Sequence, residues 1–194
     1  MDTQDRRYQR THKLIKDELE KMLVEMEYSE ITVSSLSERV NINRKTFYNH
    51  YDCLDDVLSE ILEEFVGLTV AYIRTRLFSE GSPKIEGLIT GFFRMLRDKE
   101  ALHKRILCSP DCRRVWEKSV AMLTSENLAL IDGHIKIDDF RTKATVLYLT
   151  QSIMPIYTEW LKSDRSMSDE ELGDLLEHLM LYGAKDMLPK VFNV

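Results

Sequence analysis

The sequence contains few of the residues that interrupt helices. Only seven glycines and four prolines occur among its 194 residues, and runs of β-branched residues are few. Glycine and proline are the least favourable residues in a helix interior, so their scarcity predicts a largely helical chain. The remaining composition, 43% hydrophobic and 31% charged, is ordinary for a globular protein with one large domain or a small one plus a medium one.

Long apolar segments are also missing. No run approaches the roughly 18–20 residues that a membrane-spanning helix needs, and the first residues, MDTQDRRYQR, lack the apolar core of a secretory signal. The three cysteines, Cys53, Cys108 and Cys112, are too few to form a disulfide framework and suit a reducing compartment. We therefore expect a cytoplasmic protein.

Motifs of catalysis and cofactor binding are absent as well. The sequence has no Gly-rich phosphate loop, no G-x-S-x-G elbow and no H-E-x-x-H motif, and its five histidines show no metal-ligand spacing. Cys108 and Cys112, with His103 nearby, are candidates for a metal or redox site, but buried apolar cysteine is the favoured interpretation. We predict no enzyme activity, no cofactor and no metal.

Positive charge is scarce overall but clustered. The net charge is −6, and the first 51 residues contribute nothing to it, because they carry nine basic and nine acidic residues. Within them, residues 1–16 and 39–51 each sum to +3, and the intervening residues 17–38 sum to −6. Both basic segments could meet phosphates, and two such modest patches favour a dimer that presents the pair twice.

A candidate helix-turn-helix motif occupies residues 32–51, TVSSLSERVNINRKTFYNHY. The spacing of Val33, Leu36 and Val40 predicts one face of a helix. Thr32 precedes this helix and is a suitable N-cap, because its hydroxyl can accept a hydrogen bond from a free backbone N–H of the first turn.

Two asparagines mark the turn and the second helix of this motif. Asn41 lies where the chain must turn sharply, and asparagine tolerates the left-handed backbone conformation. Asn43 can cap a helix that begins at Arg44. The second helix of such a motif lies in the major groove of DNA.

The outward residues of the second helix are polar or aromatic, and none is acidic. Arg44 and Lys45 can reach guanine edges or phosphates, and Asn49 matches the hydrogen-bonding groups of adenine. The alternative is a polar face that only meets solvent. With the start of the first helix, the predicted DNA-binding residues are Thr32, Ser34, Asn43, Arg44, Lys45, Thr46, Tyr48, Asn49 and His50.

The segment ITVSSLSERVNINRKTFYNHY resembles the DNA-binding domain of TetR/AcrR-family transcriptional repressors, most specifically in its ending TFYNHY. The resemblance covers roughly residues 8–62, and the chain length fits the family. Two positions depart from the family's pattern. Asn41 stands where glycine is frequent, and Leu54, beside two acidic residues, stands where a phosphate-binding lysine is frequent.

The resemblance implies an all-α fold of about nine helices. It implies an N-terminal three-helix DNA-binding domain at residues 1–52 and a C-terminal helical bundle at residues 53–194 for effector binding and dimerisation. It also implies a homodimer, paired through helices at residues 138–162 and 169–188, that binds a palindromic operator in double-stranded DNA. Such a dimer would act as a repressor that a small-molecule effector releases from the DNA. The alternative is a DNA-binding adaptor whose C-terminal domain docks a protein; nothing in the sequence supports a helical-bundle enzyme.

Apolar periodicity predicts the boundaries of the other helices. Ser109 and Pro110 suit the start of one helix, Ser168 and Glu171 form a capping box for the last, and Gly67 is a candidate bend. The expected helices cover residues 5–26, 53–78, 84–98, 99–107, 109–131, 138–162 and 169–188.

A ligand pocket is expected from the resemblance within residues 84–160. Gln151 and His134 are candidates for orienting a polar ligand there. Aromatic residues at helical spacing more often belong to a plain core, so no lining residue is assigned. The aromatic candidates are Phe92, Phe93, Trp116, Tyr148, Tyr157 and Trp160.

Overall fold

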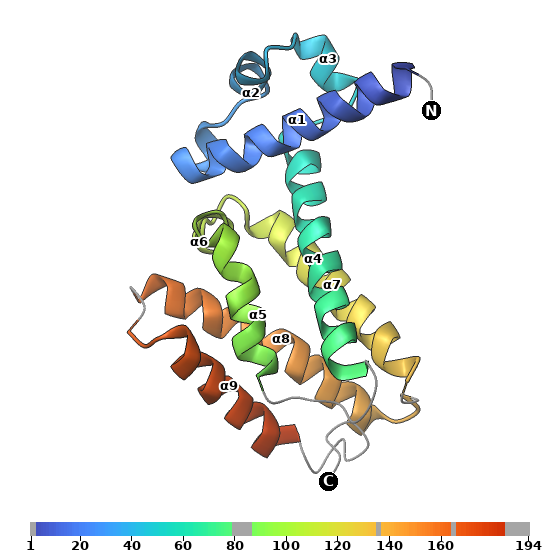
Figure 1. Cartoon of the computed structure of the whole chain (residues 1–194), viewed down its shortest axis with the longest axis vertical. Coiled ribbons are helices and arrows are strands. Elements are labelled where there is room, and N and C mark those ends of the chain that lie inside the picture. Colours follow the sequence, from blue (N-terminus) through green and yellow to red (C-terminus); the bar gives the residue numbers. More distant parts are fainter. Residues whose placement is uncertain (1–2, 79–86, 135–136, 164–165, 185–194) are drawn as a thin grey trace. The chain divides into compact units, whose positions relative to one another are not determined.

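The computed structural model describes residues 3–78, 87–134, 137–163 and 166–184. Over these residues the chain forms nine α-helices, two short 3-10 helices and no strand, which confirms the predicted all-α fold (Figure 1). Within the same residues, every helix is too short or too polar to cross a membrane. The elements are α1 Thr3–Glu25, η1 Tyr28–Glu30, α2 Val33–Val40, α3 Arg44–Tyr48, α4 Leu54–Phe78, α5 Leu88–Leu96, η2 Arg97–Lys99, α6 Glu100–Cys108, α7 Arg113–Asp132, α8 Phe140–Lys162 and α9 Asp169–Ala184.

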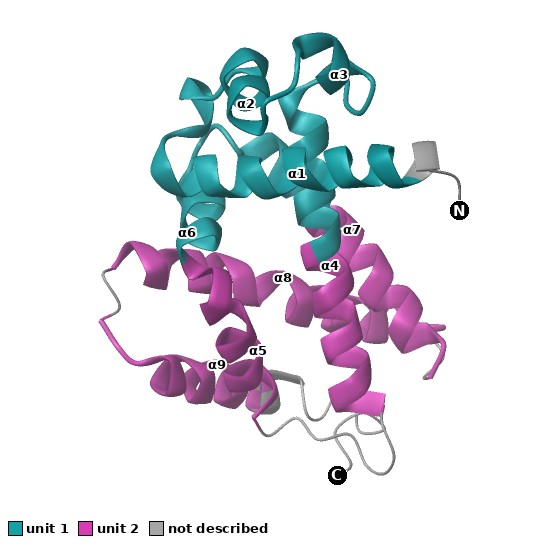
Figure 2. Ribbon diagram, turned by 45° about the horizontal axis from the view of Figure 1, so that its top comes forward, with its two compact units in different colours: residues 1–64, 101–119 teal, residues 65–100, 120–194 magenta. Residues whose placement is uncertain are grey.

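The chain divides into two compact units, which Figure 2 shows in different colours. Unit 1 contains residues 1–64 and 101–119, and unit 2 contains residues 65–100 and 120–194. These units do not coincide with a single division after residue 52, because α6 and the start of α7 pack with the N-terminal helices. The assignment of DNA binding and effector binding to separate domains stays a prediction.

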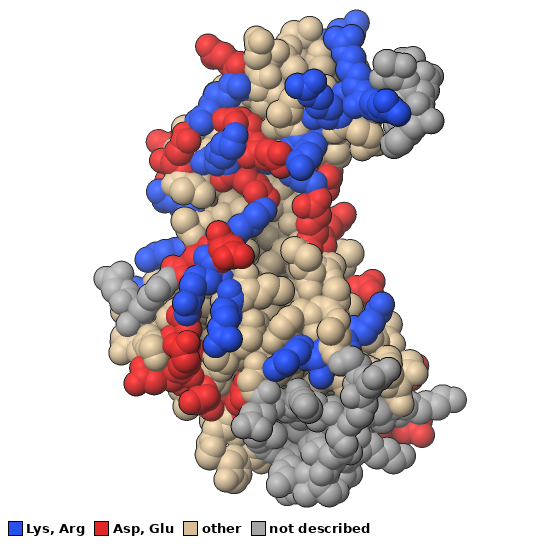
Figure 3. All heavy atoms as spheres, in the orientation of Figure 1, with Lys and Arg blue, Asp and Glu red and all other residues tan. Residues whose placement is uncertain are grey.

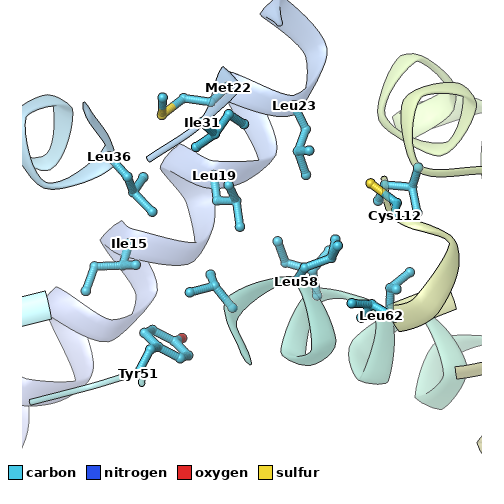
Figure 4. Close-up of a cluster of buried hydrophobic side chains, with 14 of the residues drawn as sticks. Ile15, Leu19, Met22, Leu23, Ile31, Leu36, Tyr51, Leu58, Leu62 and Cys112 are labelled. Carbon is cyan, nitrogen blue, oxygen red and sulfur yellow. The ribbon is translucent and has the colours of Figure 1, made fainter. Parts of the chain in front are cut away.

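The core of unit 1 joins helices that are distant in the sequence. Ile15 and Leu19 of α1, Leu36 of α2 and Leu58 of α4 are completely buried in one cluster, together with Cys112 from the turn before α7 (Figure 4). Full burial of such an aliphatic side chain contributes about 1.5–3 kcal/mol. This apolar cluster packs the helix-turn-helix motif against α1 and α4.

Unit 2 contains a close approach of α5 and α9. A Cβ atom on Gly173 of α9 would stand only 2.9 Å from the Cα atom of Thr90, so no larger residue fits there without movement. The buried carboxylate of Glu177, also on α9, accepts hydrogen bonds from the backbone N–H groups of Gly87 and Ile89 at 2.9 Å each. A carboxylate at this end also complements the α5 helix dipole, so α9 anchors the start of α5.

Most predicted helix boundaries agree with the structure, and two features differ. α7 begins at Arg113 rather than at Pro110, because Ser109 and Pro110 form a turn in which the hydroxyl of Ser109 accepts from the N–H of Asp111. α4 also continues without interruption through Gly67. The helix expected at residues 5–26 begins at Thr3 instead. The start of the helix expected at 84–98 and the end of the helix expected at 169–188 lie outside the described residues.

Candidate nucleic-acid interface

The first helix of the motif begins where the sequence predicts. Thr32 is the N-cap of α2: its hydroxyl accepts from the N–H of Ser35 at 3.0 Å, and its own N–H donates to the Ser35 hydroxyl at 3.0 Å. This reciprocal pair satisfies two backbone donors that the helix leaves free. Leu36 faces the core, while Ser34 stays exposed beside the cap.

The turn between the two helices depends on Asn41. Its backbone adopts φ 59° and ψ 46°, the left-handed conformation predicted for this residue. The N–H of Asn41 donates to Glu38 at 3.0 Å and that of Ile42 donates to Ser37 at 2.9 Å, which closes the end of α2. The chain then reverses direction within three residues and starts α3.

α3 is a short helix with one buried anchor. The side chain of Asn43 caps it by accepting from the N–H of Thr46 at 2.8 Å and from the Thr46 hydroxyl at 3.0 Å. Phe47 is completely buried against α1 and α4. The residues around this anchor project outward, so α3 presents a polar surface with exposed Arg44, Lys45, Tyr48 and Asn49.

His50 does not project outward as the sequence suggested. α3 ends at Tyr48, and the ring of His50 stacks on Tyr8 of α1 with the ring centroids 4.1 Å apart. The ring is half-buried, and its Nδ1 atom has no hydrogen-bond partner. Burial, together with the nearby charge of His12, lowers the pKa of His50, so it is neutral near pH 7. Its placement supports α3 against α1, and its predicted DNA contact stays a prediction.

Ion pairs decide which basic residues can reach a nucleic acid. Arg39 pairs with Glu18 at 2.7 Å and with Glu25, and Lys16 pairs with Glu60 at 3.1 Å. These two cations of the predicted basic segments are therefore engaged inside unit 1. By contrast, no acidic side chain that the structure describes lies within ion-pair distance of Arg44 or Lys45.

The start of α1 supplies further exposed basic residues. Figure 3 shows Lys and Arg atoms gathered at the end of the molecule that carries α3 and the start of α1. The stack of Tyr8 on His50 places this part of α1 beside the end of α3. The exposed basic residues of this part of α1 are Arg6, Arg7, Arg10 and Lys13.

A polar network connects the motif to α1 and α4. The hydroxyl of Tyr51 donates to Glu60 at 2.8 Å, and the Nε2 atom of His12 lies 2.7 Å from the same carboxylate and 2.9 Å from the Tyr51 hydroxyl. Burial opposes ionisation of Glu60, but hydrogen bonds from Tyr51, Lys16 and His12 outweigh it and lower the pKa of Glu60. The network therefore fixes the end of the motif to the first half of α4.

The acidic start of α4 has a structural role. Asp56 accepts from the N–H groups of Asp52 and Cys53 at 3.0 Å each and thereby caps the helix. Asp55 accepts from the Tyr28 hydroxyl at 2.6 Å and pairs with Arg114; the hydrogen bond from Tyr28 is the first cause of its lowered pKa. These contacts explain why acidic residues follow Leu54, at the position where the family often has a basic residue.

Within the described residues, the cysteines belong to no cluster of metal-ligand side chains. Cys112 is completely buried, and burial raises the pKa of its thiol to about 11, so the thiol is neutral and unreactive near pH 7. Cys108 is half-buried. In the part of the chain that the structure describes, no group of three or more His, Cys, Asp or Glu side chains could hold a metal ion.

A cavity of about 100 Å³ lies in unit 2. Its walls come from α4, α5, α7, α8 and α9, and they are apolar except for Thr69, Tyr72, Asn127 and Thr150. Phe92 is the one sequence candidate on these walls.

The other sequence candidates for a pocket lie elsewhere. Gln151 is exposed, and His134 stacks on Phe78 with ring centroids 3.8 Å apart, so neither lines the cavity. Trp116 packs against the core of unit 1, whereas Tyr148 is 51% exposed.

Sequence reasoning missed two residues. Tyr8 supports the end of α3, and the spacing of Tyr8 and His12, one turn apart on a helix, was the available signal. Asn127 lines the cavity, and no sequence signal separates it from an exposed asparagine of an amphipathic helix.

The TetR-like all-α fold expected from the sequence is confirmed by two solved structures of similar fold. A transcriptional regulator of the TetR/AcrR family from Aquifex aeolicus VF5 has a TM-score of 0.60 and 15% identity, covering 87% of this chain and 96% of that chain. The dihydroxyacetone kinase operon activator DhaS has a TM-score of 0.57 and 21% identity, covering 91% and 97%. No protein-family model matches the chain, and no curated protein matches its sequence. At these identities the likeness concerns the fold.

Proposed function

We propose that this protein is a DNA-binding transcriptional regulator, and not an enzyme. The observation that carries the proposal is the exposed face of α3, which follows a left-handed turn and contains no acidic residue. The charges of Arg44 and Lys45 are not neutralised by any described side chain, so they are available to phosphates and guanine edges.

The other predicted contacts divide into base reading and backbone positioning. Asn49 is exposed, and its amide suits the N6 and N7 groups of adenine. Tyr48 is 48% exposed and can donate its hydroxyl to a phosphate. Ser34, next to the capped start of α2, adds a hydroxyl beside free backbone N–H groups.

A homodimer is the proposed DNA-binding form. Leu175, Leu179 and Tyr182 follow one another at helical spacing along α9, and they are 43%, 46% and 78% exposed. α8 adds exposed Tyr148 and Ile156. Contiguous exposed apolar residues of this kind mark association surfaces, and a twofold dimer matches a palindromic operator.

We propose that a small-molecule effector occupies the cavity of unit 2 and releases the DNA. α4 is continuous from Leu54 to Phe78: its Glu60 binds the end of the helix-turn-helix motif, and its Thr69 and Tyr72 line the cavity. A shift of α4 would change the spacing of two α3 helices from the ~34–36 Å that successive major grooves require. The effector must bind the released state more tightly than the DNA-bound state.

Two alternatives to a ligand-released repressor are an activator and an adaptor that docks a protein. DhaS is named an operon activator, and an adaptor of this fold could dock a protein on the apolar residues of α8 and α9 instead of binding a ligand. The presence of a cavity among α4, α5, α7, α8 and α9 favours the small-molecule mechanism. We therefore propose control by a small molecule; the choice of a repressor rests on the resemblance to TetR/AcrR-family repressors and not on the cavity.

A selection from random duplex DNA tests the proposed function. The purified chain should enrich a palindromic sequence, and Tyr48→Ala should lose at least about tenfold in affinity for it in a gel shift, since a hydrogen bond to a charged phosphate is worth ~1.5–3 kcal/mol. Tyr48 is exposed, so the variant should keep the helical circular dichroism of the parent. Leu68→Ala, at an exposed apolar position of α4 outside the proposed dimer surface, is the surface control and should bind normally. Failure to enrich any sequence, or full affinity in folded Tyr48→Ala, would contradict the proposal.

A further inference from the structure

The cavity of unit 2 contains a buried acceptor without a donor. Asn127 of α7 lines the cavity and is 5% exposed, and its Oδ1 atom has no hydrogen-bond partner. A buried amide oxygen that makes no hydrogen bond costs free energy, because folding has removed it from water. Such a group at a cavity wall is therefore suited to a ligand that brings a donor.

Two of the three hydroxyl groups on the cavity wall already have acceptors for their hydrogens. Thr69 donates to the carbonyl of Phe65 at 2.9 Å, and Tyr72 donates to the carbonyl of Leu88 at 2.9 Å. Neither hydrogen is available to Asn127. Among the residues that line the cavity, Asn127 is the one with a buried side-chain polar atom that lacks a partner, and Thr150 adds one more hydroxyl to the wall.

Charge and size restrict the ligand further. None of the residues that line the cavity carries a charge, and an ion transferred into such surroundings would lose its hydration without a partner. The volume of about 100 Å³ is of the order of the apolar cavities of about 150 Å³ that accept benzene. Met154 and Met180 also line it, and their unbranched side chains adapt to the shape of a guest.

We propose that this cavity binds an uncharged, largely apolar molecule about the size of one six-membered ring, which donates a single hydrogen bond to the side chain of Asn127. Hydroxylated or N–H-bearing aromatic and alicyclic compounds have this chemistry. The role of such a molecule as the effector rests on the function proposed above, whereas its binding does not.

Three probes of similar size test the proposal: phenol, toluene and benzoate. They share the ring and differ in donor and charge. Titration calorimetry on the full chain without DNA, at pH 7, should detect phenol and toluene, and benzoate should bind at least tenfold more weakly than phenol. Asn127→Leu keeps the branched shape and the number of side-chain heavy atoms and removes the acceptor, so the affinity ratio of phenol to toluene should fall about tenfold or more.

This ratio isolates the hydrogen bond. Both probes lose similar ring hydration on binding, and the cost of removing the phenol hydroxyl from water is the same in both proteins, so it cancels in the comparison. Asn127→Leu should also unfold at a higher temperature than the parent, because the unpaired polar group is gone. Thr124→Val is the matched control: Thr124 is a buried polar residue of the same helix that does not line the cavity, and its substitution should leave the ratio unchanged.

Several outcomes would overturn the proposal. They are the absence of binding by all three probes at millimolar concentration, an unchanged phenol-to-toluene ratio in Asn127→Leu, and benzoate that binds as tightly as phenol. Parallel DNA selection separates this inference from the proposed function. If a duplex is enriched but the phenol-to-toluene ratio is unchanged in Asn127→Leu, the ligand proposal alone is refuted. If the ratio falls in Asn127→Leu but no duplex is enriched, the regulatory function alone is refuted.

Discussion

Asn41 is the residue on which the turn between α2 and α3 depends. Its left-handed backbone is the one positive φ angle at a non-glycine residue among the described part of the chain. An asparagine pays less for this conformation than other residues with a Cβ atom, because its short amide can bond locally. The orientation of α3, and with it the candidate DNA-binding face, follows from this single conformation.

Two substitutions at this position test that dependence. Asn41→Gly should retain a stability close to that of the parent, because glycine adopts positive φ freely, whereas Asn41→Ala should be less stable than Asn41→Gly by about 1 kcal/mol. Urea unfolding monitored by circular dichroism measures the difference. Equal stability of the two variants would show that the turn does not impose this backbone conformation.

His50 gives the protein a predicted pH dependence. It lies against Tyr8 and His12 of α1, close to the Tyr51–Glu60 pair, and its pKa is lowered by burial and by the charge of His12. As the pH falls through the ordinary histidine value near 6.5, the unfolded chain takes up the proton before the folded chain does. Stability should therefore decrease as the pH is lowered from 7.5 to 5.5.

Urea midpoints at these two pH values measure the effect. His50→Gln removes the titrating ring and should show a smaller loss between pH 7.5 and pH 5.5, although it should be less stable than the parent at pH 7.5, since it lacks the stack on Tyr8. A loss as large as that of the parent would assign the pH dependence to other groups.

At the scale of the elements, two helical glycines differ in their surroundings: one is required by close helix packing, and the other faces open space. Gly173 of α9 lies against Thr90 of α5, whereas nothing lies within 4 Å of a Cβ atom built on Gly67 of α4. The sequence marks Gly67 as a candidate bend, but it lies in an uninterrupted helix. Only the tertiary contact distinguishes the two positions.

Matched substitutions by alanine should therefore have opposite signs. Gly173→Ala should destabilise the protein by roughly 1–3 kcal/mol, because α5 and α9 must separate. Gly67→Ala should stabilise it by about 0.5–1 kcal/mol, since alanine loses less backbone entropy in a helix. Thermal and urea unfolding measure both. A stabilised Gly173→Ala would mean that α5 and α9 are not in this close contact.

At the scale of the whole molecule, the proposed DNA binding is expected to depend on the number of copies that bind together. One α3 helix presents two basic residues without described acidic partners, Arg44 and Lys45, and few phosphate contacts give weak binding. A dimer doubles the charges and the base contacts. The exposed apolar residues of α8 and α9 are the proposed means of forming it.

The double substitution Leu175→Glu with Leu179→Glu should disrupt this association, because it places charges in an apolar interface. Light scattering should then report a monomer at micromolar concentration, and affinity for a palindromic duplex should fall by at least about 100-fold. Leu68→Glu, at a 63% exposed position of α4, is the matched control and should remain a dimer. A parent chain that is itself monomeric would contradict the dimer proposal.

Much of the helix-turn-helix motif could be predicted because its determinants are local. Thr32, Asn41 and Asn43 act on backbone groups within four residues of themselves, and the burial of Leu36 and Phe47 follows from their helical spacing. His50 was misplaced for the opposite reason. Whether it faces solvent depends on Tyr8, which is far away in the sequence and lies on another helix.

The candidate site could be predicted only in part for the same reason. Net charge by segment does not distinguish Arg39, which pairs with Glu18, from Arg44, which has no described acidic partner. Similarly, the resemblance implied a pocket within residues 84–160, but of the aromatic residues considered there only Phe92 lines the cavity of unit 2.

By itself, then, the sequence determined the helical class, most helix boundaries and the caps and turn of the helix-turn-helix motif, because these rest on spacing and on hydrogen bonds between near neighbours. Tertiary structure alone decided that residues 101–119 pack with the N-terminal helices, that Glu177 holds the start of α5 from 90 residues away, and that Asn127 faces a cavity. These features arise where helices distant in the sequence meet, and the periodicity of one helix shows which face is buried without showing what it meets.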